Sequence, residues 1–264
     1  MLADYHVHSY FSEDTDCPME NEIRKAIEIG LDELCFTEHV DYGIPTVDQC
    51  DYDSYFEEFF RMKEKYKNQI KLKAGIEFGV QVHTVPEYEE AFKKYPFDFV
   101  LLSFHQVDDK EFWRQDFQKG KTQEEYNRKY YEEILEVAKI YKNYSVIAHI
   151  DVIKRYDLQG EYPFEKIKDQ IRQIFEVIIP DGKGIEINTS SRAYKLKSLM
   201  PSREILELYH EMGGEVITIG SDSHNEERIG EDVQEMQNLL REIGFKGIYT
   251  FDQMQPVFHP FETE

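Results

Sequence analysis

Short apolar runs alternate with longer amphipathic runs along the whole chain. The apolar runs are rich in β-branched and aromatic residues and predict strands, whereas apolar positions three or four residues apart in the longer runs predict helices. The predicted strands cover residues 2–9, 32–39, 70–79, 97–105, 144–151, 184–190, 215–224 and 247–252. The predicted helices cover residues 19–30, 52–69, 86–95, 122–142, 163–182, 202–214 and 232–244. This alternation predicts an α/β fold with a parallel sheet.

The number of strand–helix units favours a closed barrel over an open, doubly wound sheet. A chain of 264 residues is close to the length of about 250 residues that is usual for one barrel. We therefore expect residues 1–264 to form a single barrel domain. The sequence has neither a glycine-rich nucleotide-binding motif nor a GxSxG nucleophile elbow, which argues against nucleotide-binding sheets and serine hydrolases.

Three segments carry more detailed expectations. Thr122 and Glu125 form a capping-box pattern at the start of helix 122–142. The aromatic stripe of helix 52–69 is expected to pack in the core, and it consists of Tyr55, Phe56, Phe59 and Phe60. Segment 106–121 is polar, holds the only tryptophan and is longer than a usual strand–helix loop. We expect this loop to close over a substrate.

The net charge of the chain limits the classes of molecule that it is expected to bind. With 53 acidic and 31 basic side chains and a net charge of −22, the chain is a poor match for nucleic acid or an anionic membrane surface. A small phosphorylated molecule remains compatible, provided that bound cations supply positive charge locally. No signal peptide or membrane span is recognisable. The three cysteines form no CxxC pair, which fits a reducing, cytoplasmic location. The oligomeric state stays open.

Histidine, glutamate and aspartate recur at the C-terminal ends of the predicted strands. They are His6, His8, His39, Glu77, His105, His149, Asp222 and His224. In a parallel barrel these ends form one face, where active sites lie. Because residues i and i+2 of a strand point the same way, His6 and His8 can both face the barrel mouth. Imidazole and carboxylate groups without thiolate predict a site for Zn, Fe or Mn.

Basic residues follow two of the same strands. Arg155 comes after the fifth strand and Arg192 after the sixth, and a planar guanidinium suits phosphate oxygens. We expect both arginines to bind a substrate phosphate, with Lys154 and Lys195 as weaker candidates. His83 follows the third strand near the same face and is a candidate substrate contact.

The ordered pattern of HxH, TEH, a glutamate after the third strand, two strand-end histidines and DxH resembles the PHP (polymerase and histidinol phosphatase) superfamily. The resemblance spans the chain from His6 to His224. The stretches "FTEHVDY", "IAHIDVIKRYD", "GIEINTSSR" and "SDSH" look most like the monofunctional histidinol-phosphate phosphatases. The resemblance implies a distorted (β/α)7 barrel with a trinuclear metal site at the C-terminal face of the strands.

The resemblance also implies how three divalent metal ions (Zn, Fe or Mn) are divided among the ligands. The first metal would be held by His6, His8, Glu77 and Asp222. The second would be held by the bridging Glu77 with His105 and His149. The third would be held by His39, His224 and Asp14. Many relatives have a histidine where this chain has Asp14, and Glu13 is the neighbour that could substitute for it.

The activity implied by the resemblance is hydrolysis of L-histidinol phosphate to L-histidinol and phosphate, a reaction of histidine biosynthesis. A metal-bridging hydroxide would attack the phosphorus, with Glu77, Asp222 and His224 as catalytic residues. Asp222 or a metal-bound water would protonate the leaving group. Three alternatives stay open: a phosphatase for another small ester or nucleotide, an amidohydrolase-type metal hydrolase, and a non-catalytic metal-binding module.

Overall fold

Seven parallel strands form the central sheet of the computed structural model, which describes residues 1–43 and 49–261. Each strand overlaps a predicted one, and their order in the sheet follows their order in the chain. The strands are β1 (Ala3–Val7), β2 (Glu33–Val40), β3 (Lys71–Gly79), β4 (Phe99–Ser103), β7 (Val146–Ile147), β8 (Gly184–Asn188) and β9 (Ile217–Gly220).

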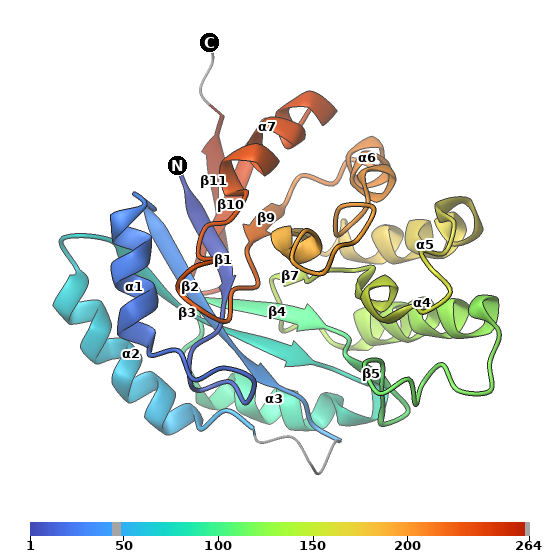
Figure 1. Cartoon of the computed structure of the whole chain (residues 1–264), viewed down its shortest axis with the longest axis horizontal. Coiled ribbons are helices and arrows are strands. Elements are labelled where there is room, and N and C mark those ends of the chain that lie inside the picture. Colours follow the sequence, from blue (N-terminus) through green and yellow to red (C-terminus); the bar gives the residue numbers. More distant parts are fainter. Residues whose placement is uncertain (44–48, 262–264) are drawn as a thin grey trace.

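The sheet curves into a nearly closed barrel (Figure 1). The first strand, β1, bridges to the chain just beyond the last strand, β9, at the C-terminal end of the barrel. There Val7 forms a parallel bridge with Ser223, and the His8 amide donates to the Ser223 carbonyl at 2.9 Å. The predicted α/β barrel is therefore confirmed, in the distorted seven-stranded form.

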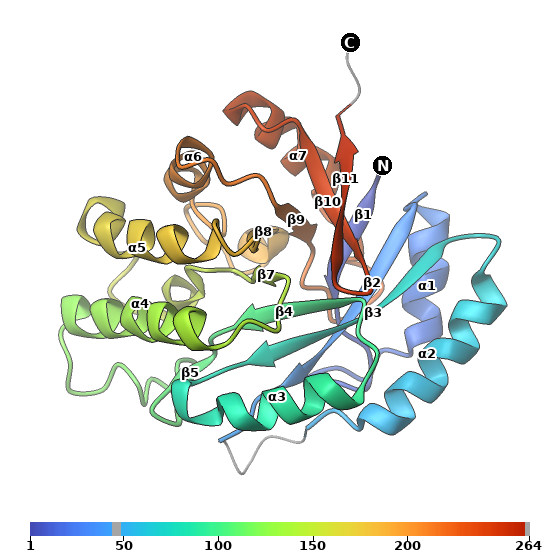
Figure 2. The same cartoon turned by 180° about the vertical axis from the view of Figure 1, so that it is seen from behind.

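Helices cover the outside of the barrel (Figures 1 and 2). They are α1 (Met19–Glu28), α2 (Tyr52–Tyr66), α3 (Val85–Lys94), α4 (Gln123–Ile140), α5 (Lys168–Ile178), α6 (Arg203–Glu211) and α7 (Val233–Ile243). The predicted capping box of Thr122 and Glu125 is present at the start of α4. The predicted aromatic stripe of α2 is buried except for Phe60, which is 50% exposed. No helix within the described ranges has the length and apolar character needed to cross a bilayer.

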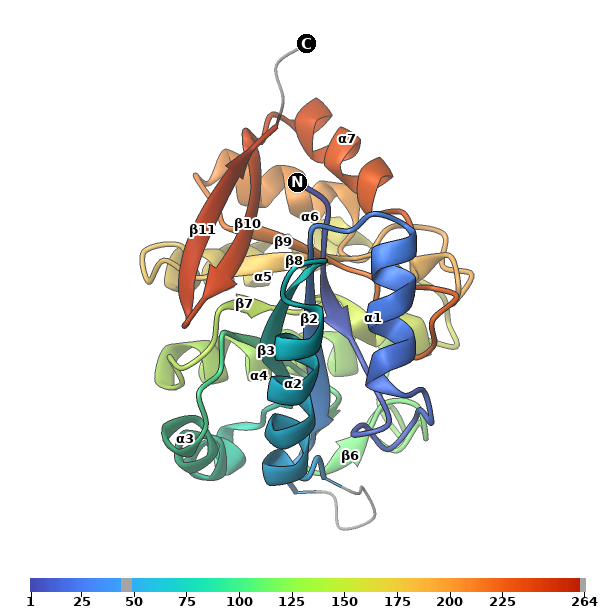
Figure 3. The same ribbon diagram turned by 90° about the vertical axis from the view of Figure 1, so that its left-hand side faces the viewer.

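Two short antiparallel hairpins lie outside the seven-stranded sheet. The first, β5 (Gln106–Val107) with β6 (Lys110–Glu111), lies within the segment predicted as an irregular loop. The second consists of β10 (Gly247–Asp252) and β11 (Gln255–Pro260) (Figure 3). The predicted strand 247–252 thus exists, but it pairs with an unpredicted strand and does not extend the barrel.

The second hairpin helps to close the N-terminal end of the barrel. Phe251 joins an interior apolar cluster with residues of four barrel strands, which include Tyr5, Phe99 and Val146. The Phe251 amide donates to the Tyr5 hydroxyl at 2.8 Å. This end of the barrel is therefore filled by packed side chains, which leaves the opposite, C-terminal end for polar groups.

A register shift in β1 turns two histidines toward the barrel interior. The pairing of β1 with β2 is irregular between Asp4 and Val7. Before the shift Tyr5 belongs to the interior cluster, whereas after it Val7 packs in the outer core with the helices. The side chains of His6 and His8 consequently face inward, as the predicted alternation requires.

Candidate metal centre

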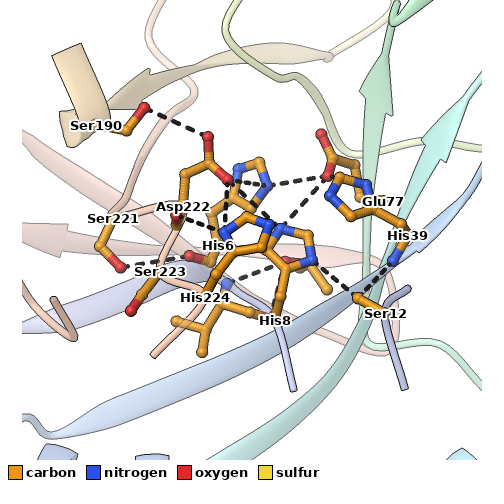
Figure 4. Close-up of polar contacts among 12 residues, drawn as sticks. His6, His8, Ser12, His39, Glu77, Ser190, Ser221, Asp222, Ser223 and His224 are labelled. Carbon is orange, nitrogen blue, oxygen red and sulfur yellow. Dashed lines mark hydrogen bonds and ion pairs between the residues drawn. The ribbon is translucent and has the colours of Figure 1, made fainter. Parts of the chain in front are cut away.

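The predicted strand-end residues come together at the C-terminal end of the barrel (Figure 4). Ligand atoms lie within 4.8 Å of one another in four overlapping groups. The groups are His6–His8–Asp222, His6–Glu77–His149, His39–Glu77–His105 and His8–His39–His224. All eight strand-end residues of the sequence analysis belong to at least one group, so the spatial clustering predicted for them is confirmed.

Glu77 lies at the centre of the cluster and is fully buried. Its Oε2 atom is 2.9 Å from His39 Nδ1 and 3.2 Å from His6 Nε2. Its Oε1 atom is 2.8 Å from His149 Nε2 and 3.2 Å from His105 Nε2. Burial disfavours the carboxylate, but the surrounding imidazoles outweigh burial and hold the pKa of Glu77 well below its ordinary value. Glu77 is therefore a shared carboxylate between two sets of histidines.

Asp222 joins the cluster from the loop after β9. Its Oδ1 atom lies 3.6 Å from His8 Nε2 and 3.8 Å from His6 Nε2. Its Oδ2 atom accepts from Arg155 at 2.9 Å. The backbone of Asp222 has φ 53°, which is uncommon for a residue with a Cβ and indicates local strain at a functional position.

Asp14 completes the exposed side of the cluster. Its Oδ2 atom lies 2.9 Å from His224 Nε2 and 3.7 Å from His39 Nε2. Partial burial opposes its negative charge, but the neighbouring histidines His39 and His224 outweigh burial and lower the pKa of Asp14. The structure thus places Asp14 where the resemblance expects a third ligand beside these two histidines.

Several ring nitrogens at the centre lie close to carboxylate oxygens or to one another, yet among the described residues they make no hydrogen bond of good geometry. These buried atoms are His6 Nε2, His8 Nε2, His39 Nδ1 and His224 Nε2, together with Glu77 Oε2. Buried polar atoms without partners are costly and rare. Convergent lone pairs of imidazole and carboxylate suit divalent zinc, iron or manganese. The donor set therefore fits a bound metal cluster.

Other polar side chains contact the second ring nitrogen of two of these histidines. His105 Nδ1 lies 2.8 Å from Asp41 Oδ1. His8 Nδ1 lies 3.1 Å from Ser12 Oγ, and that hydroxyl donates to Glu38 at 2.7 Å. The sequence pattern does not predict these partners. Their only signal is position, since Asp41 follows His39 by two residues and Ser12 follows His8 by four.

A cavity of about 290 Å³ opens above the cluster. It is lined by Glu13, Asp14, His39, Asp41, His105, Trp113, His149, Val152, Arg155, Tyr156, Tyr194, Asp222 and His224. Metal-ligand types lie on one side, and Trp113, Tyr156 and Tyr194 form an aromatic side that the sequence analysis did not identify. Trp113 comes from the predicted loop 106–121, so part of that loop does reach the cavity.

Arg155 is the predicted arginine that the structure brings to the cavity. Its Nη2 atom donates to Ser190 Oγ at 2.7 Å as well as to Asp222. Its guanidinium carbon lies 3.8 Å from the centre of the Tyr194 ring. These contacts hold the planar cation at one orientation beside the cluster.

The other two predicted substrate contacts do not line the cavity. Arg192 is exposed and pairs with Asp232 and Glu235 at the start of α7. His83 pairs with Asp109 at 2.9 Å in an exposed position. The geometry gives no support to a phosphate contact for Arg192 or a substrate contact for His83.

Comparisons with known proteins find consistent likenesses. The model of the PHP domain family matches residues 4–190. The histidinol-phosphatase of Lactococcus lactis is 32% identical and the match covers 96% of this chain and 95% of the relative. The probable histidinol-phosphatase of Clostridium acetobutylicum is 29% identical, with 94% of this chain and 96% of the relative covered.

A solved structure gives the same likeness in three dimensions. The crystal structure of histidinol phosphate phosphatase from Lactococcus lactis, complexed with zinc, L-histidinol and phosphate, superposes with a TM-score of 0.87 at 30% identity. The match covers 97% of this chain and 98% of that chain. The likeness therefore extends over the barrel as a whole and is not confined to the histidine cluster.

Proposed function

The chain belongs to the PHP domain family, and from this membership we propose that it is a metal-dependent phosphomonoesterase that hydrolyses L-histidinol phosphate to L-histidinol and phosphate. The observation that carries the proposal is the cluster of imidazole and carboxylate groups that lies at the cavity beside Arg155. The relative that binds zinc, L-histidinol and phosphate supports the choice of substrate. The reaction would serve histidine biosynthesis in the cytoplasm.

The ligands divide among three divalent metals as the family resemblance implies. His6, His8, Glu77 and Asp222 would hold the first metal. Glu77, His105 and His149 would hold the second, and Asp14, His39 and His224 the third. Zinc in the Lactococcus lactis structure makes zinc the first candidate, ahead of iron and manganese. When bound, such metals lower the pKa of water from 15.7 toward about 7 and offset negative charge on phosphoryl oxygens.

Arg155 would orient the phosphoryl group. Asp222 and Ser190 fix its Nη2 atom, and its buried Nε–H has no partner among the described residues. Burial opposes the guanidinium charge, but Asp222 outweighs burial and raises the pKa of Arg155 further above its ordinary value. Arg155 therefore stays cationic and keeps a donor available for an anionic oxygen.

The aromatic side of the cavity would receive the imidazole end of the substrate. Trp113 is 42% exposed although most large aromatic residues of this chain are buried. Its ring lies 6.5 Å from that of Tyr156, between centroids. Glu13 lines the same cavity and has the charge opposite to that of the substrate ammonium. With its phosphate at the metal ligands, the substrate would thus place its imidazole ring and its ammonium group at the opening of the cavity.

Replacing Trp113 by Ala should weaken binding of substrates that carry a ring. We expect KM for L-histidinol phosphate to rise about 5- to 10-fold, the loss of one aromatic contact. KM for β-glycerol phosphate, which has no ring, should stay unchanged. Steady-state phosphate release with both esters measures the effect, and Phe60→Ala on the outer face of α2 is the matched control. Equal losses for both esters would contradict ring recognition by Trp113.

The proposed function itself is tested by phosphate release from L-histidinol phosphate beside AMP, p-nitrophenyl phosphate and other small esters. Metal content should be measured on the same preparation. We expect a strong preference for L-histidinol phosphate and close to three metals per chain. A preference for another ester would overturn the substrate, and turnover that survives complete metal removal would overturn the metal-dependent chemistry.

A further inference from the structure

Strand β8 contributes no ligand to the proposed metal cluster, yet it places a carboxylate directly behind that cluster. Glu186 is 1% exposed and lies in the middle of β8. Its two oxygens contact two different ligand histidines, one from β1 and one from the end of β7. Burial of a carboxylate destabilises the fold unless its oxygens accept hydrogen bonds or contact cationic groups. The contacts of Glu186 therefore indicate a specific role.

One oxygen of Glu186 holds the His6 ring. His6 Nδ1 lies 2.6 Å from Glu186 Oε1, a short, charge-assisted contact. With Nδ1–H donating to the carboxylate, the lone pair of the neutral ring is on Nε2. That atom is the one that lies 3.2 Å from Glu77 and lacks a hydrogen-bond partner within the described residues. Glu186 thus selects the His6 tautomer that can bind metal.

The other oxygen of Glu186 holds the backbone of His149. Oε2 accepts from the His149 amide at 3.0 Å and from Asn188 Nδ2 at 3.3 Å. His149 has φ 24°, a conformation that L residues rarely adopt. This turn breaks the strand alternation and directs the His149 ring toward Glu77, with Nε2 at 2.8 Å from Oε1. The amide contact helps to keep the unusual backbone in place.

Strand β9 leaves room for this arrangement. A Cβ on Gly220 would lie 2.4 Å from Glu186 Oε1 and 2.2 Å from the Cβ of His6. Only glycine at this position lets β9 pass beside the pair. The packing around Glu186 is therefore built for close contact with His6.

We propose that Glu186 is a positioning residue for the metal cluster, which sets the tautomer of His6 and the backbone of His149. The proposal rests on the metal site of the proposed function but not on the identity of the substrate. Glu186 touches neither substrate nor metal in this role. It acts through two ligand histidines that are far apart in the sequence, as second carboxylates behind metal-bound imidazoles do in general.

The substitution Glu186→Gln tests whether Glu186 positions the metal ligands or only stabilises the fold. The amide has one acceptor oxygen where the carboxylate has two, so it cannot accept from His6 and from His149 at the same time. We expect the affinity of the metal-free protein for zinc to fall about 10- to 100-fold. Competition with a chromophoric zinc chelator measures the affinity. Long-range ¹H–¹⁵N spectra of the histidine rings should show that His6 is no longer fixed with its proton on Nδ1.

Glu33→Gln is the matched control. Glu33 is a buried carboxylate on β2 that contacts the Tyr5 hydroxyl, near the end of the barrel away from the cluster. Its replacement should leave zinc affinity unchanged. If Glu186→Gln does not fold, Glu186→Asp keeps the charge but shortens the side chain, and it should lower zinc affinity in the same direction.

Three results would overturn the proposal: wild-type zinc affinity in the Glu186 variants, an unchanged His6 tautomer, or equal losses of affinity in Glu186→Gln and Glu33→Gln. None of these measurements involves the phosphate ester. A failure of the proposed substrate would therefore leave this test intact, and a failure of this test would leave the substrate assignment intact.

Discussion

Replacement of Glu77 by Gln should remove most of the bound metal and lower kcat at least about 10³-fold, the upper range for loss of one electrostatic group at a reaction centre. Both oxygens of Glu77 contact histidines, with His39 at 2.9 Å and His149 at 2.8 Å. Gln has the same shape but no charge, and it presents a donor where an acceptor is needed. Elemental analysis of the purified variant and phosphate release measure the two effects.

The matched control for this experiment is Glu22→Gln. Glu22 lies on α1, is equally buried, and its burial raises the pKa to about 10. The carboxyl is therefore already neutral near pH 7, so that the amide changes little. Metal content and turnover should stay at wild-type levels in Glu22→Gln. Normal metal content in Glu77→Gln would show that the shared carboxylate is not a ligand.

Replacement of Arg155 by Ala should lower kcat/KM for the phosphate ester by about 10²- to 10³-fold without loss of metal. The guanidinium is the cationic side chain that lines the cavity beside Asp222. Asp222 stays anchored in the variant, because Asn188 and Ser190 each donate to its Oδ2 at 3.3 Å. Steady-state kinetics and elemental analysis on one preparation separate loss of phosphate binding from loss of metal.

Arg192→Ala tests the second arginine in the same assay. The sequence pattern predicts a higher KM for this variant, whereas the structure predicts an unchanged one because Arg192 pairs with Asp232 and Glu235 at the surface. A raised KM in Arg192→Ala with no change in Arg155→Ala would reverse the assignment of the two arginines.

The sequence was sufficient for the barrel and for the clustering of its ligand-type residues. Regular alternation of strands and helices predicts parallel strands, and parallel strands bring their C-terminal ends to one face. His105 at the end of β4 and His39 in β2 could be placed together without knowledge of any contact. Glu77, near the C-terminal end of β3, is predicted to lie beside histidines of other strands for the same reason.

The local backbone geometry of the site and the ion pairs between distant residues could not be predicted from the sequence pattern. Side-chain directions depend on the register shift in β1 and on the φ of 24° at His149. Neither feature can be predicted from the residue types at these positions. Arg192 lies outside the cavity lining and pairs with acids 40 and 43 residues later in the chain. Segment 106–121 is predicted to close over a substrate, but its polar pattern does not indicate that Trp113 is the side chain that lines the cavity.

The meeting of β1 with β9 has a consequence for the maturation of the protein. The bridge between Val7 and Ser223 joins the first strand to the last, and the cluster takes His6 from one side of this seam and His224 from the other. A nascent chain on the ribosome therefore offers an incomplete set of ligands until residue 224 has emerged. With the proposed division of ligands, the first and third ions would load late, because they need Asp222 and His224, whereas the ligands of the second ion all precede residue 150. An ion that binds the folded barrel but not the unfolded chain would then stabilise the folded state, in which β1 and the chain after β9 are joined.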